Sequence, residues 1–228
     1  CRLLPLGPER GETARGGGGD AGSELGQLRF AGPPLGDRRL ERRHVGDTGT
    51  LNLGGTLFRT LDGLTLNNAG SILWGSTGAI NLSNGAVVNN LASGVFEAQG
   101  DALLQWAAGA LPAFNNAGVM RKSAGAGTTT FGNGVTFSGG NVEVLTGTLS
   151  LAASGTTTGG NFTAAAGAVL DLTGGQTRTY VGAYTGAGAV VNGANAATIE
   201  GFKIDGAQYG ISCNGTSPEI LNCRIVNL

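Results

Sequence analysis

Near its C-terminal end the chain repeats one pattern: IEGFKI at residues 199–204 is followed by ILNCRI at residues 220–225, a shift of 21 residues. Between the two copies lie YGISC at 209–213 and a turn-forming NGTSP at 214–218. Apolar residues alternate with polar ones in these short runs, which is the pattern of strands with one buried face. The stretch therefore predicts strands at 199–204, 209–213 and 220–225.

Upstream of this stretch the same kind of repetition continues with a different sequence. An apolar residue followed by two asparagines begins LNNAG at residue 66, VNNLASG at residue 88 and FNNAG at residue 114, and weaker copies begin at residues 137 and 158. A second pattern, a glycine followed by alternating apolar residues, begins at residues 78, 100, 147 and 167. In this second pattern the alternation predicts inward-facing side chains at Ile80, Leu82, Leu149, Leu151, Leu170 and Leu172.

Each period of about 20–26 residues thus carries two or three short strands, and no helical pattern of ten residues intervenes. A chain of this kind buries one face of every strand by stacking each coil on the previous one, about 4.8 Å away, with parallel pairing. The predicted fold class is all-β, a parallel β-helix or β-solenoid. The recurring asparagines are open to two interpretations, a hydrogen-bonded ladder between coils or simple turn residues.

Composition divides the chain into two regions. Residues 1–48 hold eight arginines and seven acidic residues, whereas residues 49–228 hold only six basic and eight acidic residues. We predict that 1–48 is a disordered or low-complexity leader and that 49–228 is the solenoid, cut off at its C-terminal end within a repeat. The chain has 44 glycines among its 228 residues, and in the solenoid we expect them at the corners of the coils.

The C-terminal coils resemble the right-handed parallel β-helix repeat of the pectate-lyase-like superfamily. The resemblance rests on GFKI at 201–204, GISC at 210–213 and SPEILNCRI at 217–225. The middle of the chain is similar to the repeats of bacterial adhesins, haemagglutinin-like proteins and autotransporter passengers, through FNNAGVMRKS at 114–123 and GTLSL at 147–151. These resemblances imply a β-helix in a large secreted or cell-surface protein, with polysaccharide or host and cell-surface components as partners.

The pectate-lyase-like resemblance also implies where a catalytic site would lie: aspartates around calcium, and a basic residue near the scissile bond. The eight acidic residues of 49–228 form no local cluster, and the one histidine, His44, lies in the predicted leader. Carboxylates can still meet across coils about 21 residues apart, for which Glu200 with Glu219 or Asp205 is the nearest candidate set. The sequence otherwise indicates outward-facing solubilising charge, and we assign no catalytic, cofactor-binding or metal-binding residue and no cofactor.

Four smaller features complete the expectations. The pair Arg121–Lys122 is expected to face solvent, and Trp74 and Trp106 fall at different points of their coils and predict no aromatic stripe. Cys213 and Cys223 fit either buried free thiols, which we favour, or a disulfide in a secreted compartment. The net charge of −1 gives no electrostatic case for nucleic acid, and no apolar run is long enough for a membrane-spanning helix.

The sequence favours a non-catalytic structural or adhesive β-solenoid segment of an extracellular or cell-surface bacterial protein. An alternative is a polysaccharide lyase or glycoside hydrolase of the pectate-lyase-like class whose active site lies largely outside this segment. A third interpretation, an ice-binding or surface-binding solenoid, depends on threonine rows such as 128–130 and 156–158, which the intervening coils do not continue.

Overall fold

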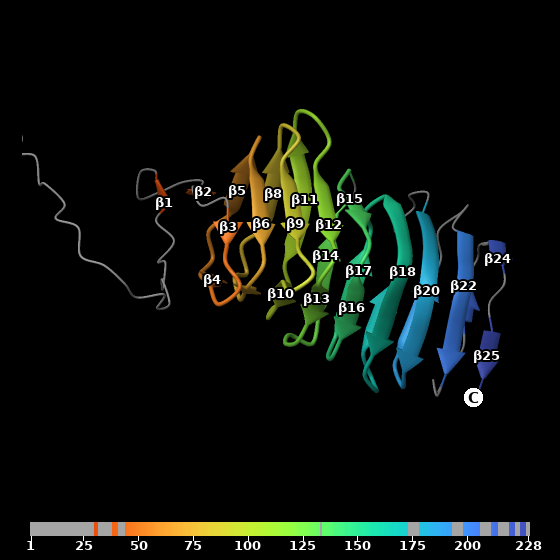
Figure 1. Cartoon of the computed structure of the whole chain (residues 1–228). Coiled ribbons are helices and arrows are strands. Elements are labelled where there is room, and N and C mark those ends of the chain that lie inside the picture. The colour runs from red at the N-terminus through yellow and green to blue at the C-terminus, as the bar shows by residue number, and fades with distance from the viewer. Residues whose placement is uncertain are drawn as a thin grey trace, which may run out of the picture.

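The computed structural model describes residues 30–31, 38–40, 44–132, 134–172, 178–192, 198–205, 211–213, 219–221 and 224–226. Side chains are described within residues 44–189, apart from 133, 156–159 and 173–182. Throughout these residues every regular element is a β-strand, so the fold is all-β. The chain winds into a parallel β-solenoid of about six turns of roughly 22 residues each, as predicted (Figure 1).

The strands fall into three sheets that run along the length of the solenoid. Sheet A contains ten strands, β1 (Phe30–Ala31), β2 (Arg38–Leu40), β5 (Arg59–Asp62), β8 (Ile80–Ser83), β11 (Leu103–Ala108), β14 (Thr128–Phe131), β17 (Thr148–Leu151), β19 (Val169–Asp171), β21 (Ala189–Asn192) and β23 (Ile211–Cys213). Sheet B contains five strands, β3 (His44–Val45), β6 (Thr65–Asn68), β9 (Val87–Asn90), β12 (Ala113–Asn116) and β15 (Thr136–Ser138). Sheet C contains the strands β4 (Thr50–Leu53), β7 (Ser71–Trp74), β10 (Val95–Ala98), β13 (Val119–Lys122), β16 (Asn141–Val144), β18 (Gly155–Ala164), β20 (Arg178–Gly186), β22 (Thr198–Asp205), β24 (Glu219–Leu221) and β25 (Arg224–Val226).

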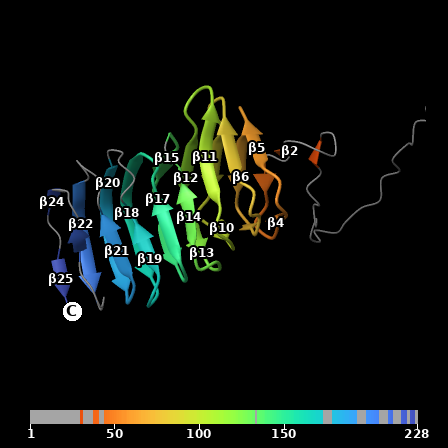
Figure 2. The same ribbon diagram turned by 180° about the vertical axis from the view of Figure 1, so that it is seen from behind.

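Each coil visits the sheets in the same order, so strands that are neighbours in a sheet come from successive coils. Figure 1 looks onto sheets B and C, and Figure 2 looks onto sheet A from behind. Sheet B ends at β15, where Thr136 forms an isolated bridge with Ser154. The ten-residue strand β18 begins directly after Ser154, and its last residues pair with β16 in sheet C. From this coil on, sheet C contains the longer strands β18, β20 and β22, with register shifts midway along their pairing.

The predicted registers are confirmed in sheet B and at the C-terminal end of sheet C, whereas in sheet A Ile80 pairs with Leu104, 24 residues on, and not at the 22-residue step between the glycines at 78 and 100. In sheet B, Leu66, Val88 and Phe114 pair in sequence, and Phe114 pairs with Phe137, which reproduces the predicted steps of 22, 26 and 23 residues. At the C-terminal end Ile199 pairs with Ile220 and Ile204 with Ile225, the predicted shift of 21. The six leucine and isoleucine side chains predicted to face inward are all at most 2% exposed.

The core is a column of apolar side chains enclosed by the sheets. At its centre one phenylalanine from each sheet meets the others edge to face: Phe114 lies 5.1 Å from Phe96 and 5.0 Å from Phe131 between ring centroids. Trp74 joins this cluster from sheet C, whereas Trp106 is 41% exposed in sheet A. The two tryptophans thus share no stripe, as the sequence indicated.

Glycines line the corner between sheets B and C, but close approach matters there as much as backbone conformation. A Cβ on Gly118 would lie 2.1 Å from the carbonyl oxygen of Gly94, although Gly118 has no positive φ. At Gly140 both reasons apply, because φ is +74° and a Cβ would lie 2.4 Å from the side-chain nitrogen of Asn116. We expected left-handed corners, and the structure adds that the coils are stacked too closely for a side chain.

The predicted boundary between leader and solenoid at residues 48 and 49 stays a prediction. Strand β3 lies before that boundary, yet it pairs with β6 and its Val45 is 1% exposed in the core. The turn predicted at 214–218, the side chain of Cys213 and all of Cys223 lie outside the described residues.

Candidate functional site

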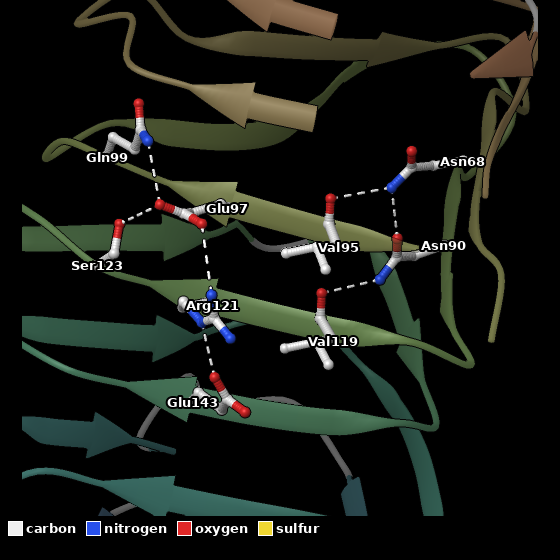
Figure 3. Close-up of polar contacts among 9 residues, drawn as sticks. All are labelled: Asn68, Asn90, Val95, Glu97, Gln99, Val119, Arg121, Ser123 and Glu143. Atoms are coloured by element: carbon white, nitrogen blue, oxygen red, sulfur yellow. Dashed lines mark hydrogen bonds and ion pairs between the residues drawn. The ribbon is translucent and has the colours of Figure 1, made fainter. Parts of the chain in front are cut away.

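The outward face of sheet C carries a short row of charges from three successive coils (Figure 3). Strand pairing aligns Glu97 with Arg121 and Arg121 with Glu143, so the guanidinium lies between two carboxylates. Arg121 Nε donates to Glu143 Oε2 at 2.7 Å, and Arg121 Nη1 lies 3.6 Å from Glu97 Oε2. At this row each carboxylate contacts the guanidinium of the neighbouring coil, so acidic and basic side chains pair across coils.

Further hydrogen bonds hold Glu97 in its ionised form. Ser123 Oγ donates to Glu97 Oε1 at 2.7 Å, and Gln99 Nε2 donates to the same oxygen at 3.0 Å. The bond from Ser123 is the main reason that the pKa of Glu97 lies below its usual range, with Gln99 and Arg121 adding to it against the opposing effect of burial. A general acid requires a raised pKa, so Glu97 is suited to an ion pair rather than to proton donation.

A second charged pair lies at the corner between sheets C and A. Lys122 is fully buried, and its Nζ donates to Asp101 Oδ1 at 2.7 Å, to the carbonyl oxygens of Gly100 and Ala124, and to Thr129 Oγ1. The hydrogen bond from Lys122 is the main reason that the pKa of Asp101 is lowered. The prediction that Lys122 faces solvent is wrong, because Lys122 occupies the inward row of β13 together with Met120, both at 0% exposure.

Arg59 performs a similar task in an earlier coil. It is 5% exposed, and its guanidinium donates to the carbonyl oxygens of Gly54, Leu57 and Phe58 in the preceding turn. Ser76 Oγ donates to the carbonyl oxygen of Gly55 at this corner in the next coil. Buried polar side chains thus supply the hydrogen-bond donors that the turn carbonyls between sheets C and A require.

The paired asparagines form two ladders one residue apart, which favours the ladder interpretation over simple turn residues. The inner ladder, Asn68, Asn90 and Asn116, is buried, with side-chain bonds of 2.7 Å from Asn68 to Asn90 and from Asn90 to Asn116. Each rung also donates to a backbone carbonyl in sheet C, at Val95, Val119 and Asn141 respectively. Figure 3 shows the first two rungs and their carbonyl partners.

The outer ladder lies on the outward face of sheet B, and its hydrogen bonds have the reverse polarity: each side-chain amide donates to the asparagine of the preceding coil. Asn89 Nδ2 donates to Asn67 Oδ1 at 2.7 Å, Asn115 Nδ2 donates to Asn89 Oδ1 at 2.9 Å, and Ser138 Oγ donates to Asn115 Oδ1 at 3.0 Å. Because successive residues of a strand point to opposite faces, an Asn-Asn pair in each coil builds one ladder inside and one outside.

The other sequence candidates are resolved only in part. The side chains of Glu200, Asp205 and Glu219 lie outside the described residues, so their meeting across coils stays a prediction. In the threonine row at 128–130, Thr129 is buried and donates to the Gly100 carbonyl, and the side chains of 156–158 are not described. Among the described residues no group of three or more His, Cys, Asp or Glu side chains is placed to hold a metal ion.

Comparison with known proteins adds no functional assignment. No protein-family model, no curated protein and no solved structure matches the chain. In the described part of the chain, no helix has the length and apolar character needed to cross a membrane.

Proposed function

We propose that the chain is a non-catalytic structural or adhesive β-solenoid segment of a secreted or cell-surface bacterial protein. One observation carries the proposal: the charged side chains of the central coils bind one another, or turn carbonyls, across successive coils. Glu97, Arg121 and Glu143 join three coils, and Lys122 joins two. Charges used in this way hold successive coils of the stack together.

The likeness of the middle repeats to adhesin and autotransporter passenger sequence supports an adhesive stalk outside the cell. A stack of parallel coils suits that role because each added coil lengthens a rod about 4.8 Å at a time without changing its cross-section. Polysaccharide or host and cell-surface components are the partners that we propose for such a stalk.

The alternative is a polysaccharide lyase or hydrolase, and one experiment separates it from the stalk. The purified chain is incubated with polygalacturonate and neutral glycans, with and without calcium, while new unsaturated or reducing ends are measured. We expect no product above the protein-free blank. Turnover that disappears in Asp205→Asn or Lys203→Met would contradict the structural role.

The variants Glu97→Gln and Glu143→Gln make the test sharper, because both residues are described and both pair with Arg121. If the carboxylate is structural, the substitution lowers the melting temperature, and glycan turnover stays at the blank level as in the parent chain. If the carboxylate is catalytic, the parent chain turns glycan over, and the substitution abolishes this turnover with little change in melting temperature.

A further inference from the structure

One coil of the solenoid departs from its neighbours in length. Asn90 lies 22 residues after its ladder partner Asn68, whereas Asn116 lies 26 residues after Asn90. Two of the four extra residues fall between β9 and β10, and the other two fall between sheets A and B, where β11 has six residues while β8 and β14 have four. The loop between β11 and β12 consequently stands out beyond the turns of the adjacent coils (Figure 1). Insertions of this kind in repeat proteins often mark a binding face.

The segment at residues 106–111, which covers the end of β11 and most of the loop that follows it, is exposed and apolar along its whole length. Its sequence is WAAGAL, all six residues are exposed, and Trp106 and Leu111 reach 41% and 61% exposure. No charged residue occurs between 102 and 120. A soluble repeat gains nothing from six consecutive exposed apolar residues, so the segment needs a partner surface.

Several polar atoms of this segment and of the adjoining Pro112 are bound within the protein. The carbonyl oxygens of Ala108 and Ala110 accept from the backbone N–H groups of Asn84 and Gly85, and that of Pro112 accepts from Thr136. The indole Nε1 of Trp106 donates to the carbonyl oxygen of Gly109 at 3.2 Å. Carbonyls and an indole N–H that are occupied in this way lose no hydrogen bond when water is removed from around them.

These features decide between partner classes. A glycan site needs free donors and acceptors beside its aromatic ring, and here the indole N–H and the carbonyls of Ala108, Gly109 and Ala110 are occupied. An anionic bilayer attracts basic residues, and this loop has none. An uncharged, exposed strand end and loop with a tryptophan and a leucine match the interfacial zone of a zwitterionic bilayer, where tryptophan is enriched.

We infer that the loop at residues 106–111 inserts shallowly into zwitterionic lipid bilayers and thereby attaches the solenoid to a membrane surface. This inference rests on the proposed adhesive role and names the surface to which the stalk adheres. A single loop of this size gives weak attachment by itself, and several copies on one surface strengthen it by avidity.

The chain supplies its own probe for the test. It has two tryptophans, and Trp74 is buried in the core, so Trp74→Phe leaves Trp106 as the only tryptophan and keeps an aromatic ring inside. This variant is mixed with phosphatidylcholine vesicles whose acyl chains carry bromine, a quencher of tryptophan emission. We expect the emission of Trp106 to shift to shorter wavelength and to be quenched, and the protein to float with the vesicles.

A matched pair of substitutions in the same background locates the contact. Leu111→Ser removes an apolar side chain from the loop and is expected to weaken vesicle partitioning by about fivefold to tenfold. Leu145→Ser removes a leucine that is 46% exposed but lies outside the loop, and it is expected to leave partitioning unchanged. Melting curves of both variants establish that each one is folded.

Several results would overturn the inference. One is that bromolipid does not quench the emission of Trp106 and the protein does not float with the vesicles. A second is that Leu111→Ser and Leu145→Ser lose vesicle binding equally. A third is that the chain forms a concentration-dependent dimer that Leu111→Ser abolishes. Binding to a neutral glycan that Leu111→Ser abolishes would likewise assign the loop to another partner. None of these results concerns glycan turnover. If the membrane inference fails, the turnover assay still tests the proposed non-catalytic role independently.

Discussion

The inner and outer asparagine ladders consist of the same residue, one position apart, in the same three strands. The inner rungs are at most 2% exposed and make two or more hydrogen bonds each, whereas the outer rungs lie on the surface of sheet B beside water. Water can replace a lost partner outside but not inside. The same contrast separates Arg121, which faces outward, from Lys122, which is buried. Which face a residue occupies, rather than its type, decides its energetic role.

The largest effect is expected from the buried cation. Lys122→Met keeps the length and apolar stem of the side chain but removes the ammonium from Asp101 and from two turn carbonyls. We expect a loss of about 4 kcal/mol in the free energy of unfolding, because buried acceptors remain without donors. Urea denaturation followed by circular dichroism measures it.

Arg121→Met is the matched control for this substitution. It breaks two ion pairs on a partly exposed face and is expected to cost about 0.5 kcal/mol. Equal losses of unfolding free energy in the two variants would contradict the prediction that burial makes Lys122 more important for stability than Arg121.

The next largest effect concerns the middle rung of the inner ladder. Asn90→Ala removes the donor to Asn116 and to the Val119 carbonyl, and it removes the acceptor for Asn68. We expect a loss of about 3 kcal/mol, again by urea denaturation, since three buried polar atoms lose a partner at once. A loss below 1 kcal/mol would mean that water enters this corner and would remove the distinction between the two ladders.

A smaller effect depends on pH. The pKa of Asp101 is lowered in the folded chain, so the unfolded chain binds more protons in acid, and the stabilisation is present above the ordinary pKa of about 4. It is lost as pH falls through the lowered value. Asp101→Asn is therefore expected to cost about 1 kcal/mol at pH 7, because the Asp101 side chain is partly exposed, and progressively less below pH 4. A constant difference from pH 7 to pH 2 would contradict this assignment.

The sequence predicted the periodic features of the molecule well. The 21-residue register at 199–225 and the inward leucines follow from alternation alone, which depends only on backbone geometry. The polar network was predicted less well. Alternation along residues 119–122 already places Lys122 on the same inward face as Met120. The prediction that Lys122 faces solvent follows instead from the general rule that lysine is seldom buried.

The partners of these polar groups were not available from the sequence. Asp101 reaches Lys122 only because the corner of one coil stacks on that of the next, and steps between coils that vary from 20 to 27 residues hide such pairings. The 26-residue step indicates a longer coil but does not locate the extra residues, so the exposure of 106–111 follows only from the placement of the neighbouring strands.

The smallest effect is expected at the outer ladder, where Asn89→Ala is the counterpart of Asn90→Ala. Asn89 bonds to Asn67 and Asn115 on the surface, so water takes up the bonds that the substitution releases. We expect a loss of about 0.5 kcal/mol or less, partly offset because alanine gives up less side-chain entropy on folding. Urea denaturation of the two alanine variants side by side gives the ratio of inner to outer rung directly. If Asn89→Ala costs as much as Asn90→Ala, the outer ladder holds the coils together as strongly as the inner one. Its amides would then belong to the stacking machinery rather than to the surface that the rod presents to a partner.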